Sequence, residues 1–147
     1  VVHLSDDRSF VVADVPGLIP GAHLGHGLGT KFLTHLERTK VLVHVIDMSP
    51  GTGRDPVRDF EVIGRELELF AGTGDETARG LAHKPTLVAA NKIDVLDDPE
   101  RLKRLKKHLA RLKVPLFPVS SATGEALREL LEGMWRELAR QMPSPVA

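Results

Sequence analysis

Asn91-Lys92-Ile93-Asp94 combines an amide, a long aliphatic cation and a carboxylate directly after an apolar run, Thr86–Ala90. The run predicts a buried strand, and α/β sheets bind their ligands beyond the carboxyl ends of such strands. The Asp94 carboxylate could accept two parallel hydrogen bonds from the ring N–H and exocyclic amine of guanine, which adenine cannot match. The Lys92 stem could cover the base plane, and Asn91 could tie neighbouring loops together. Because so short a pattern recurs by chance, Asp94 could instead simply cap a following helix.

A second polar segment, Asp14-Val15-Pro16-Gly17, follows the predicted strand Phe10–Ala13. An aspartate at a strand end could hold Mg²⁺ through water, because Mg²⁺ keeps several waters and prefers one or two carboxylates plus phosphate oxygens. Gly17 could bring its backbone N–H against a terminal phosphate, where any side chain would intrude. An ordinary Pro-Gly turn, with Asp14 capping it locally, is the alternative.

A third segment, Val119–Gly124, lies just past the last predicted strand and opens the last predicted helix. Its small residues Ser120, Ser121 and Ala122 would let backbone N–H groups approach a base oxygen. The alternative is a Ser/Thr helix cap, which is common at such positions.

Strands and helices alternate along the chain, which predicts an α/β fold with a mostly parallel sheet and helices on both faces. Asp55-Pro56 and Asp98-Pro99 are good helix starts, because a capping residue precedes a proline at the first helical position. The predicted strands are Val1–Leu4, Phe10–Ala13, Val41–Asp47, Thr86–Ala90 and Pro115–Val119, and the last predicted helix is Glu125–Gln141.

Composition narrows the class of protein. The 147 residues are at most one ordinary domain, and 20 acidic residues balance 20 basic ones, so no global charge favours nucleic acid or a membrane surface. The chain contains no cysteine, which suits a reducing cytoplasm. It contains no apolar stretch of about 18 residues, so no membrane span is expected.

In their order and strand-end placement, the three segments resemble the G domain of translation-factor-class GTPases, most closely the Obg family. Asp14–Gly17 matches the DxxG box, Asn91–Asp94 the NKxD box and Ser120–Ala122 the SA-type box. The sequence of residues Ala13–Asp47, ADVPGLIPGAHLGHGLGTKFLTHLERTKVLVHVID, also looks like Obg. The resemblance covers nearly the whole chain and implies a Ras-like P-loop GTPase fold.

The resemblance implies that Asp14 is a water-mediated Mg²⁺ partner, that Gly17 senses the γ-phosphate, and that the NKxD residues hold guanine. The backbone contact to the base oxygen would come from Ser120, Ser121 or Ala122, with the register of the SA pair left open. Leu18 stands where Ras-like enzymes carry a catalytic glutamine, so hydrolysis of GTP to GDP and phosphate is expected to be slow, and no catalytic residue is assigned. The segment Leu18–Gly29 would be switch II.

The family further implies a cytoplasmic, monomeric protein that uses GTP/GDP and Mg²⁺ and has roles in stress signalling and in maturation of the large ribosomal subunit, with ribosomal RNA and proteins as partners. A basic face from Arg101 to Lys113 is a solvated helix surface by default, and a contact to ribosomal RNA is the sharper alternative.

The phosphate-binding sequence G-x-x-x-x-G-K-[ST] does not occur in the 147 residues. We therefore expect residues 1–142 to be a partial G domain, incomplete at the N-terminus and without a P-loop or switch I, and residues 143–147 to be a linker. Alone, this chain is expected to fold poorly and to bind GTP weakly.

Two other functions compete with the GTPase switch. A degenerate G domain that binds partners through its surface alone would have no need of Asp94. An unrelated α/β enzyme would be expected to carry a dinucleotide-binding glycine fingerprint, and none occurs in the sequence.

Overall fold

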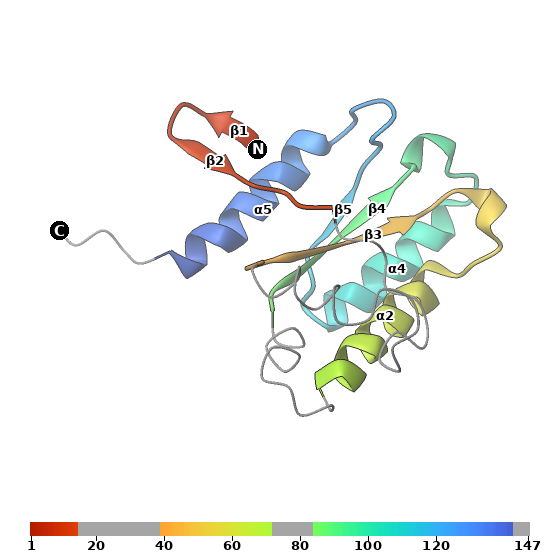
Figure 1. Cartoon of the computed structure of the whole chain (residues 1–147). Coiled ribbons are helices and arrows are strands. Elements are labelled where there is room, and N and C mark those ends of the chain that lie inside the picture. The colour runs from red at the N-terminus through yellow and green to blue at the C-terminus, as the bar shows by residue number, and fades with distance from the viewer. Residues whose placement is uncertain (15–38, 72–83, 143–147) are drawn as a thin grey trace.

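The computed structural model describes residues 1–14, 39–71 and 84–142, in which strands and helices alternate (Figure 1). In chain order the elements are β1 (Val2–Ser5), β2 (Arg8–Phe10), β3 (Leu42–Asp47), the 3-10 turn η2 (Pro50–Thr52), α2 (Pro56–Ala71), β4 (Thr86–Asn91), the 3-10 turn η3 (Ile93–Val95), α4 (Pro99–Arg111), β5 (Leu116–Pro118) and α5 (Leu127–Gln141). The predicted linker 143–147 lies outside the described residues. None of the described helices is both long and apolar enough to cross a bilayer.

The centre of the fold is a parallel sheet with the strand order β3-β4-β5. Val43 pairs with Leu87 and Ala89 with Phe117, so β4 lies between its two neighbours. From Leu87 to Ala90 the middle strand is buried without interruption. A parallel strand covered on both faces needs such a continuous apolar run, and the parallel arrangement is as predicted.

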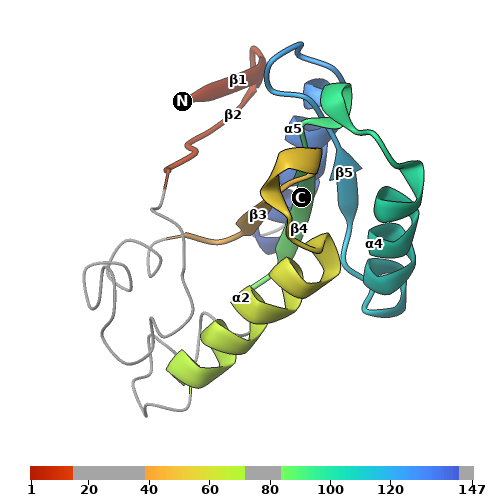
Figure 2. The same ribbon diagram turned by 90° about the vertical axis from the view of Figure 1, so that its right-hand side faces the viewer.

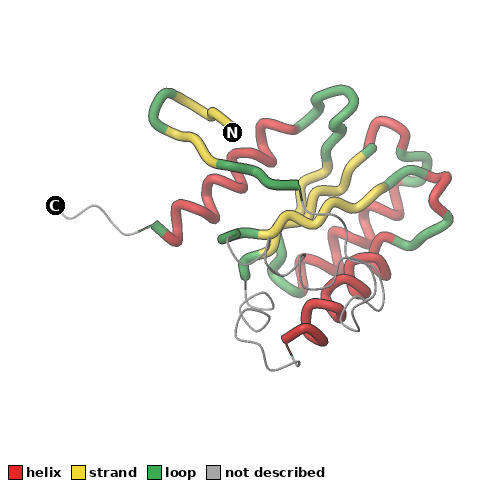
Figure 3. Tube along the Cα trace, in the orientation of Figure 1, coloured by secondary structure: helices red, strands yellow, loops and turns green. Residues whose placement is uncertain are grey.

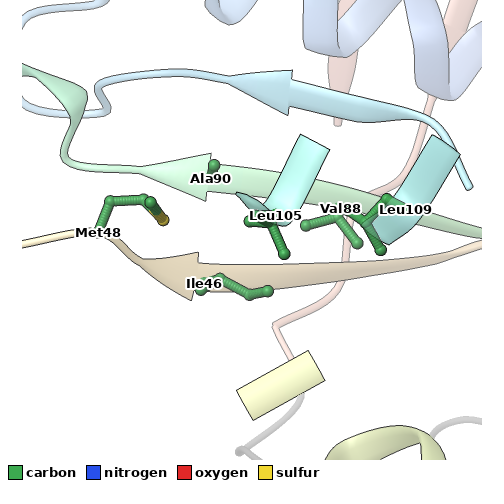
Figure 4. Close-up of a cluster of buried hydrophobic side chains, with 6 residues drawn as sticks. All are labelled: Ile46, Met48, Val88, Ala90, Leu105 and Leu109. Atoms are coloured by element: carbon green, nitrogen blue, oxygen red, sulfur yellow. The ribbon is translucent and has the colours of Figure 1, made fainter. Parts of the chain in front are cut away.

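One face of the sheet is covered by α2 and α4 (Figure 2). Two leucines of α4, Leu105 and Leu109, are fully buried against Val88. Both helices begin as their sequences predict: the carboxylate of Asp98 accepts a hydrogen bond from the Glu100 N–H at 3.0 Å. Figure 4 shows this cluster, whose buried members are Ile46, Met48, Val88, Ala90, Leu105 and Leu109.

The opposite face is covered by α5, where Leu130 and Met134 pack on Leu87 and Ala89. Successive residues of β4 therefore serve different helices, because side chains alternate across a strand. Helices on both faces of the sheet are as predicted.

The strands β1 and β2 form a separate antiparallel hairpin beside α5 (Figure 3). Arg8 of β2 is paired with Glu132 of α5 at 2.8 Å, and the rings of Phe10 and Trp135 lie 6.4 Å apart. The prediction that Phe10–Ala13 is a strand is wrong beyond Phe10. Val11 and Val12 are exposed, and no described strand pairs with them.

The sheet has an unpaired edge at β3 within the described part of the chain. Val45 of this strand is an apolar residue and is nevertheless 59% exposed. Because β2 belongs to the other sheet, the hairpin and the parallel sheet are not joined by any described strand pair. The described residues therefore form an α/β fold in which the hairpin and the parallel sheet are separate sheets.

Candidate nucleotide-binding site

The carboxyl ends of β3, β4 and β5 bring three polar segments to one edge of the sheet. The Met48 N–H donates to the Asn91 carbonyl at 2.9 Å, and the Ile93 N–H donates to the Val119 carbonyl at 3.3 Å. These backbone bonds continue the strand pairing past the last sheet residues. They fix the loops that begin at Met48, Lys92 and Val119 relative to one another.

The side chain of Asn91 joins the loop after β4 to the loop after β5. Its Nδ2 donates to Ser121 Oγ at 3.1 Å, and its Oδ1 accepts the Ser121 backbone N–H at 3.0 Å. Two bonds from one planar amide fix both the position and the tilt of the second loop.

The carboxylate of Asp94 is held from one side and open on the other. Its Oδ1 accepts a hydrogen bond from Ser120 Oγ at 2.8 Å, while the residue itself is exposed. The Ser120 side chain is fully buried, and its oxygen also accepts the Thr123 N–H at 3.2 Å. A carboxylate has about four acceptor positions, so the bond to Ser120 leaves room for a pair of donors from a base.

The alternative that Asp94 caps a helix is wrong. Asp94 lies inside η3, and Asp98 is the capping residue of α4. The Ser/Thr cap expected for the last helix is also wrong, because α5 is preceded by Ala126, which has φ 59° and makes no side-chain cap. Ser120 instead caps a local turn, in which the Gly124 N–H donates to the Ser120 carbonyl at 2.8 Å.

Lys92 points away from the other two residues of its motif. Its backbone is left-handed, with φ 69°, and its Nζ lies 2.8 Å from Asp47 Oδ2 at the end of β3. Asp47 Oδ1 also accepts the Ser49 N–H at 2.8 Å. Hydrogen bonds from Lys92 and Ser49 lower the pKa of Asp47 to about 2, so this carboxylate is charged under all ordinary conditions.

Arg101 of α4 braces the loop that follows Asp47. Its guanidinium donates to the carbonyls of Met48 at 3.1 Å, Ser49 at 3.4 Å and Arg54 at 3.1 Å. The sequence places Arg101 at the start of a basic helix face. In the structure its guanidinium instead holds the loop after β3 in place through these hydrogen bonds. Sequence reasoning also missed Asp47 as a site residue, although its position at a strand end was an available signal.

The remaining predicted residues contribute less to the described geometry. Ala122 is exposed beside Ser121, and Asp14 is exposed beyond the end of β2. Gly17 and the predicted switch II, residues 18–29, lie outside the described residues. Within the described part of the chain, no group of three or more metal-ligating His, Asp or Glu side chains occurs.

The parallel sheet, with helices on both faces and polar loops at its strand ends, defines an α/β domain. A family model described as "50S ribosome-binding GTPase" matches residues 1–92. The chain therefore belongs to this family of P-loop GTPases, and the predicted fold class, an incomplete Ras-like α/β domain, is confirmed.

The chain is also similar to curated proteins named GTPase Obg. The protein named GTPase Obg of Solibacter usitatus is 45% identical over 145 residues, which are 99% of this chain and 41% of that protein. GTPase Obg of Symbiobacterium thermophilum is 49% identical over 149 residues, covering 100% of this chain and 33% of the relative. For GTPase Obg of Aquifex aeolicus the identity is 47% over 137 residues, or 93% of this chain and 38% of the relative. The resemblance to Obg is confirmed, and the chain spans about a third to two-fifths of the length of these relatives.

Proposed function

We propose that the full-length protein is a switch of Obg type that binds GTP and GDP and hydrolyses GTP slowly to GDP and phosphate. The single observation that supports this most strongly is the Ser120–Asp94 hydrogen bond of 2.8 Å, which orients an otherwise exposed carboxylate at a strand end. A carboxylate held in this way has the acceptor geometry that a guanine edge requires.

Each residue of the base site has a distinct task in this proposal. Asp94 accepts the two donors of guanine, the Lys92 stem covers the base plane, and Asn91 holds the loop that carries Ser121. The backbone at Ser120, Ser121 or Ala122 donates to the base oxygen. The bonds of Ser120 to Asp94 and of Ser121 to Asn91 favour Ser120-Ser121 as the SA pair.

The phosphate half of the site belongs to the same proposal. Residues 1–142 are the G-domain part of the chain, and residues 143–147 are a linker. Gly17 would contact the γ-phosphate, and Asp14 would hold Mg²⁺ through water. Asp14 is an exposed carboxylate, and a single carboxylate suits Mg²⁺, which keeps its waters and takes phosphate oxygens. The bound ion would neutralise developing phosphate charge. Because no G-x-x-x-x-G-K-[ST] occurs in the 147 residues, the proposal concerns the full-length protein.

The proposed partner is the large ribosomal subunit, through its RNA and proteins. The description of the matching family as 50S ribosome-binding supports this proposal. We further propose a cytoplasmic monomer with a role in subunit assembly and in the stress response, as the Obg relationship implies.

The test is fluorescent GDP binding to the full-length protein, comparing wild type with Asp94→Asn. Asp97→Asn is a matched control, since it removes the same charge three residues further along at an exposed position. We expect Asp94→Asn to weaken GDP binding and to lose preference over ADP, and Asp97→Asn to behave like wild type. If Asp94→Asn kept both affinity and guanine preference, the role given to Asp94 would be wrong. If the wild-type protein bound no guanine nucleotide, the proposal would fail and the degenerate binding module would replace it.

A further inference from the structure

The three polar residues of the Asn91–Asp94 motif are anchored on two opposite sides of β4. Asn91 and Asp94 bond to the loop after β5, through Ser121 and Ser120. Lys92 instead reaches toward β3, where its ammonium group meets Asp47. Because the strand order is β3-β4-β5, these anchors diverge from the end of the central strand. The Lys92 stem therefore extends across the ends of β4 and β3.

The carboxylate that receives Lys92 is itself fixed. One of its oxygens accepts the Ser49 N–H at 2.8 Å, and the other lies 2.8 Å from Lys92 Nζ. The next residues are held by the Arg101 guanidinium through the Met48 and Ser49 carbonyls. Arg101, the loop after β3 and Asp47 thus form a continuous set of restraints that ends at Lys92.

A free lysine side chain populates many rotamers and loses them when it covers a base. The Lys92 side chain is half exposed, so without Asp47 its ammonium group would be free to turn into solvent. An anchor that acts before the ligand arrives reduces the ordering that binding requires, which is the general basis of preorganisation.

We infer that Asp47 is a positioning residue for guanine binding. It holds the Lys92 side chain extended across the strand ends, so that the aliphatic stem is already in place to cover the base before the nucleotide binds. This inference rests on the proposed function, since it gives Lys92 a base to cover. Asp47 touches no nucleotide in this role and acts through Lys92 alone.

The test measures GDP affinity of the full-length protein with Asp47→Asn, Asp47→Glu and a control, Glu132→Gln. Asn keeps an oxygen for the Ser49 N–H, so the loop retains that bond while the attraction for Lys92 is lost. We expect Asp47→Asn to bind GDP about 3- to 10-fold more weakly, and Asp47→Glu to recover part of that loss because it keeps the charge. Glu132→Gln breaks an ion pair of the same length, 2.8 Å to Arg8, which joins α5 to the β1–β2 hairpin, and it should leave GDP affinity unchanged.

A double-mutant cycle with Lys92→Gln separates positioning from a general structural effect. If Asp47 acts through Lys92, adding Asp47→Asn to Lys92→Gln should weaken GDP binding by less than twofold. The inference would be overturned if Asp47→Asn weakened GDP binding by the same factor in the wild-type and Lys92→Gln proteins. It would also be overturned if Asp47→Asn alone bound GDP as tightly as wild type. Thermal melts of all variants show whether each is folded at the temperature of the binding assay.

The same series tells apart failure of this inference and failure of the proposed function. A loss of guanine preference in Asp94→Asn together with unchanged binding in Asp47→Asn would refute only the role of Asp47. Absence of GDP binding by the wild-type protein would refute the proposed function itself, whatever Asp47→Asn does.

Discussion

Replacing Ser120 by alanine should loosen the candidate base site without removing any side chain or backbone donor that is proposed to contact the nucleotide. The Ser120 hydroxyl is fully buried and joins two elements of the loop: it donates to Asp94 and accepts the Thr123 N–H. Alanine removes both bonds and leaves a small void in place of one oxygen atom. The Asp94 carboxylate is then free to rotate into solvent.

The magnitude follows from these two bonds. A hydrogen bond to a charged group contributes about 1.5–3 kcal/mol when buried, but Asp94 is exposed and regains water, so we expect a value near the lower end. Thr123 is exposed as a residue, so the loss of its N–H bond to Ser120 should add less than about 1 kcal/mol. The free energy of unfolding of the G domain should fall by about 1–3 kcal/mol. Re-ordering the Asp94 side chain on binding should weaken GDP affinity by about 2- to 10-fold.

The assay is GDP binding and thermal unfolding of the full-length protein, with Ser121→Ala as the matched control. Ser121 is exposed and loses only the bond from Asn91 Nδ2, while its backbone N–H still donates to Asn91 Oδ1. We expect Ser121→Ala to stay within about twofold of wild type in GDP affinity. Equal effects of the two alanine variants would refute the reasoning that Ser120 orients Asp94.

Three further predictions concern parts of the fold outside the base site. Gly133→Ala should lower the free energy of unfolding by about 1–3 kcal/mol in a thermal melt, because the new Cβ would collide with the Phe117 ring, whereas Gly64→Ala, with open space around the new Cβ, should be neutral or stabilising. The hydrogen-bonded ion pair with Arg8 lowers the pKa of Glu132, so its contribution to stability is present above the unfolded pKa and is lost as pH falls through the folded pKa. An acid titration of the free energy of unfolding should show wild type losing stability relative to Glu132→Gln below about pH 4.5. Parallel curves for the two proteins would contradict this. If the exposed basic face of α4 contacts ribosomal RNA, Lys106→Glu should weaken binding to the large subunit and reduce the slope of log K against log[salt] by roughly one, and unchanged binding at every salt concentration would exclude that contact.

Elements with a strong local pattern agree with their sequence-based predictions. The apolar run after Pro85 becomes β4, and the Asp-Pro pairs at residues 55 and 98 start α2 and α4. The ends of elements are less well predicted. β2 stops at Phe10 because strand length depends on a pairing partner. α5 begins only at Leu127, after a turn in which the Gly124 N–H donates to the Ser120 carbonyl.

The sequence by itself determined the family-defining order of Asp14–Gly17, Asn91–Asp94 and Ser120–Ala122, and their placement after apolar strands. These features are local, since strand periodicity and neighbouring residue types are written in consecutive positions. Only the tertiary structure decided that Asp94 bonds to Ser120 and that Lys92 bonds to Asp47. Those pairs are separated by 26 and 45 residues, and they meet because the parallel register of β3, β4 and β5 aligns the strand ends.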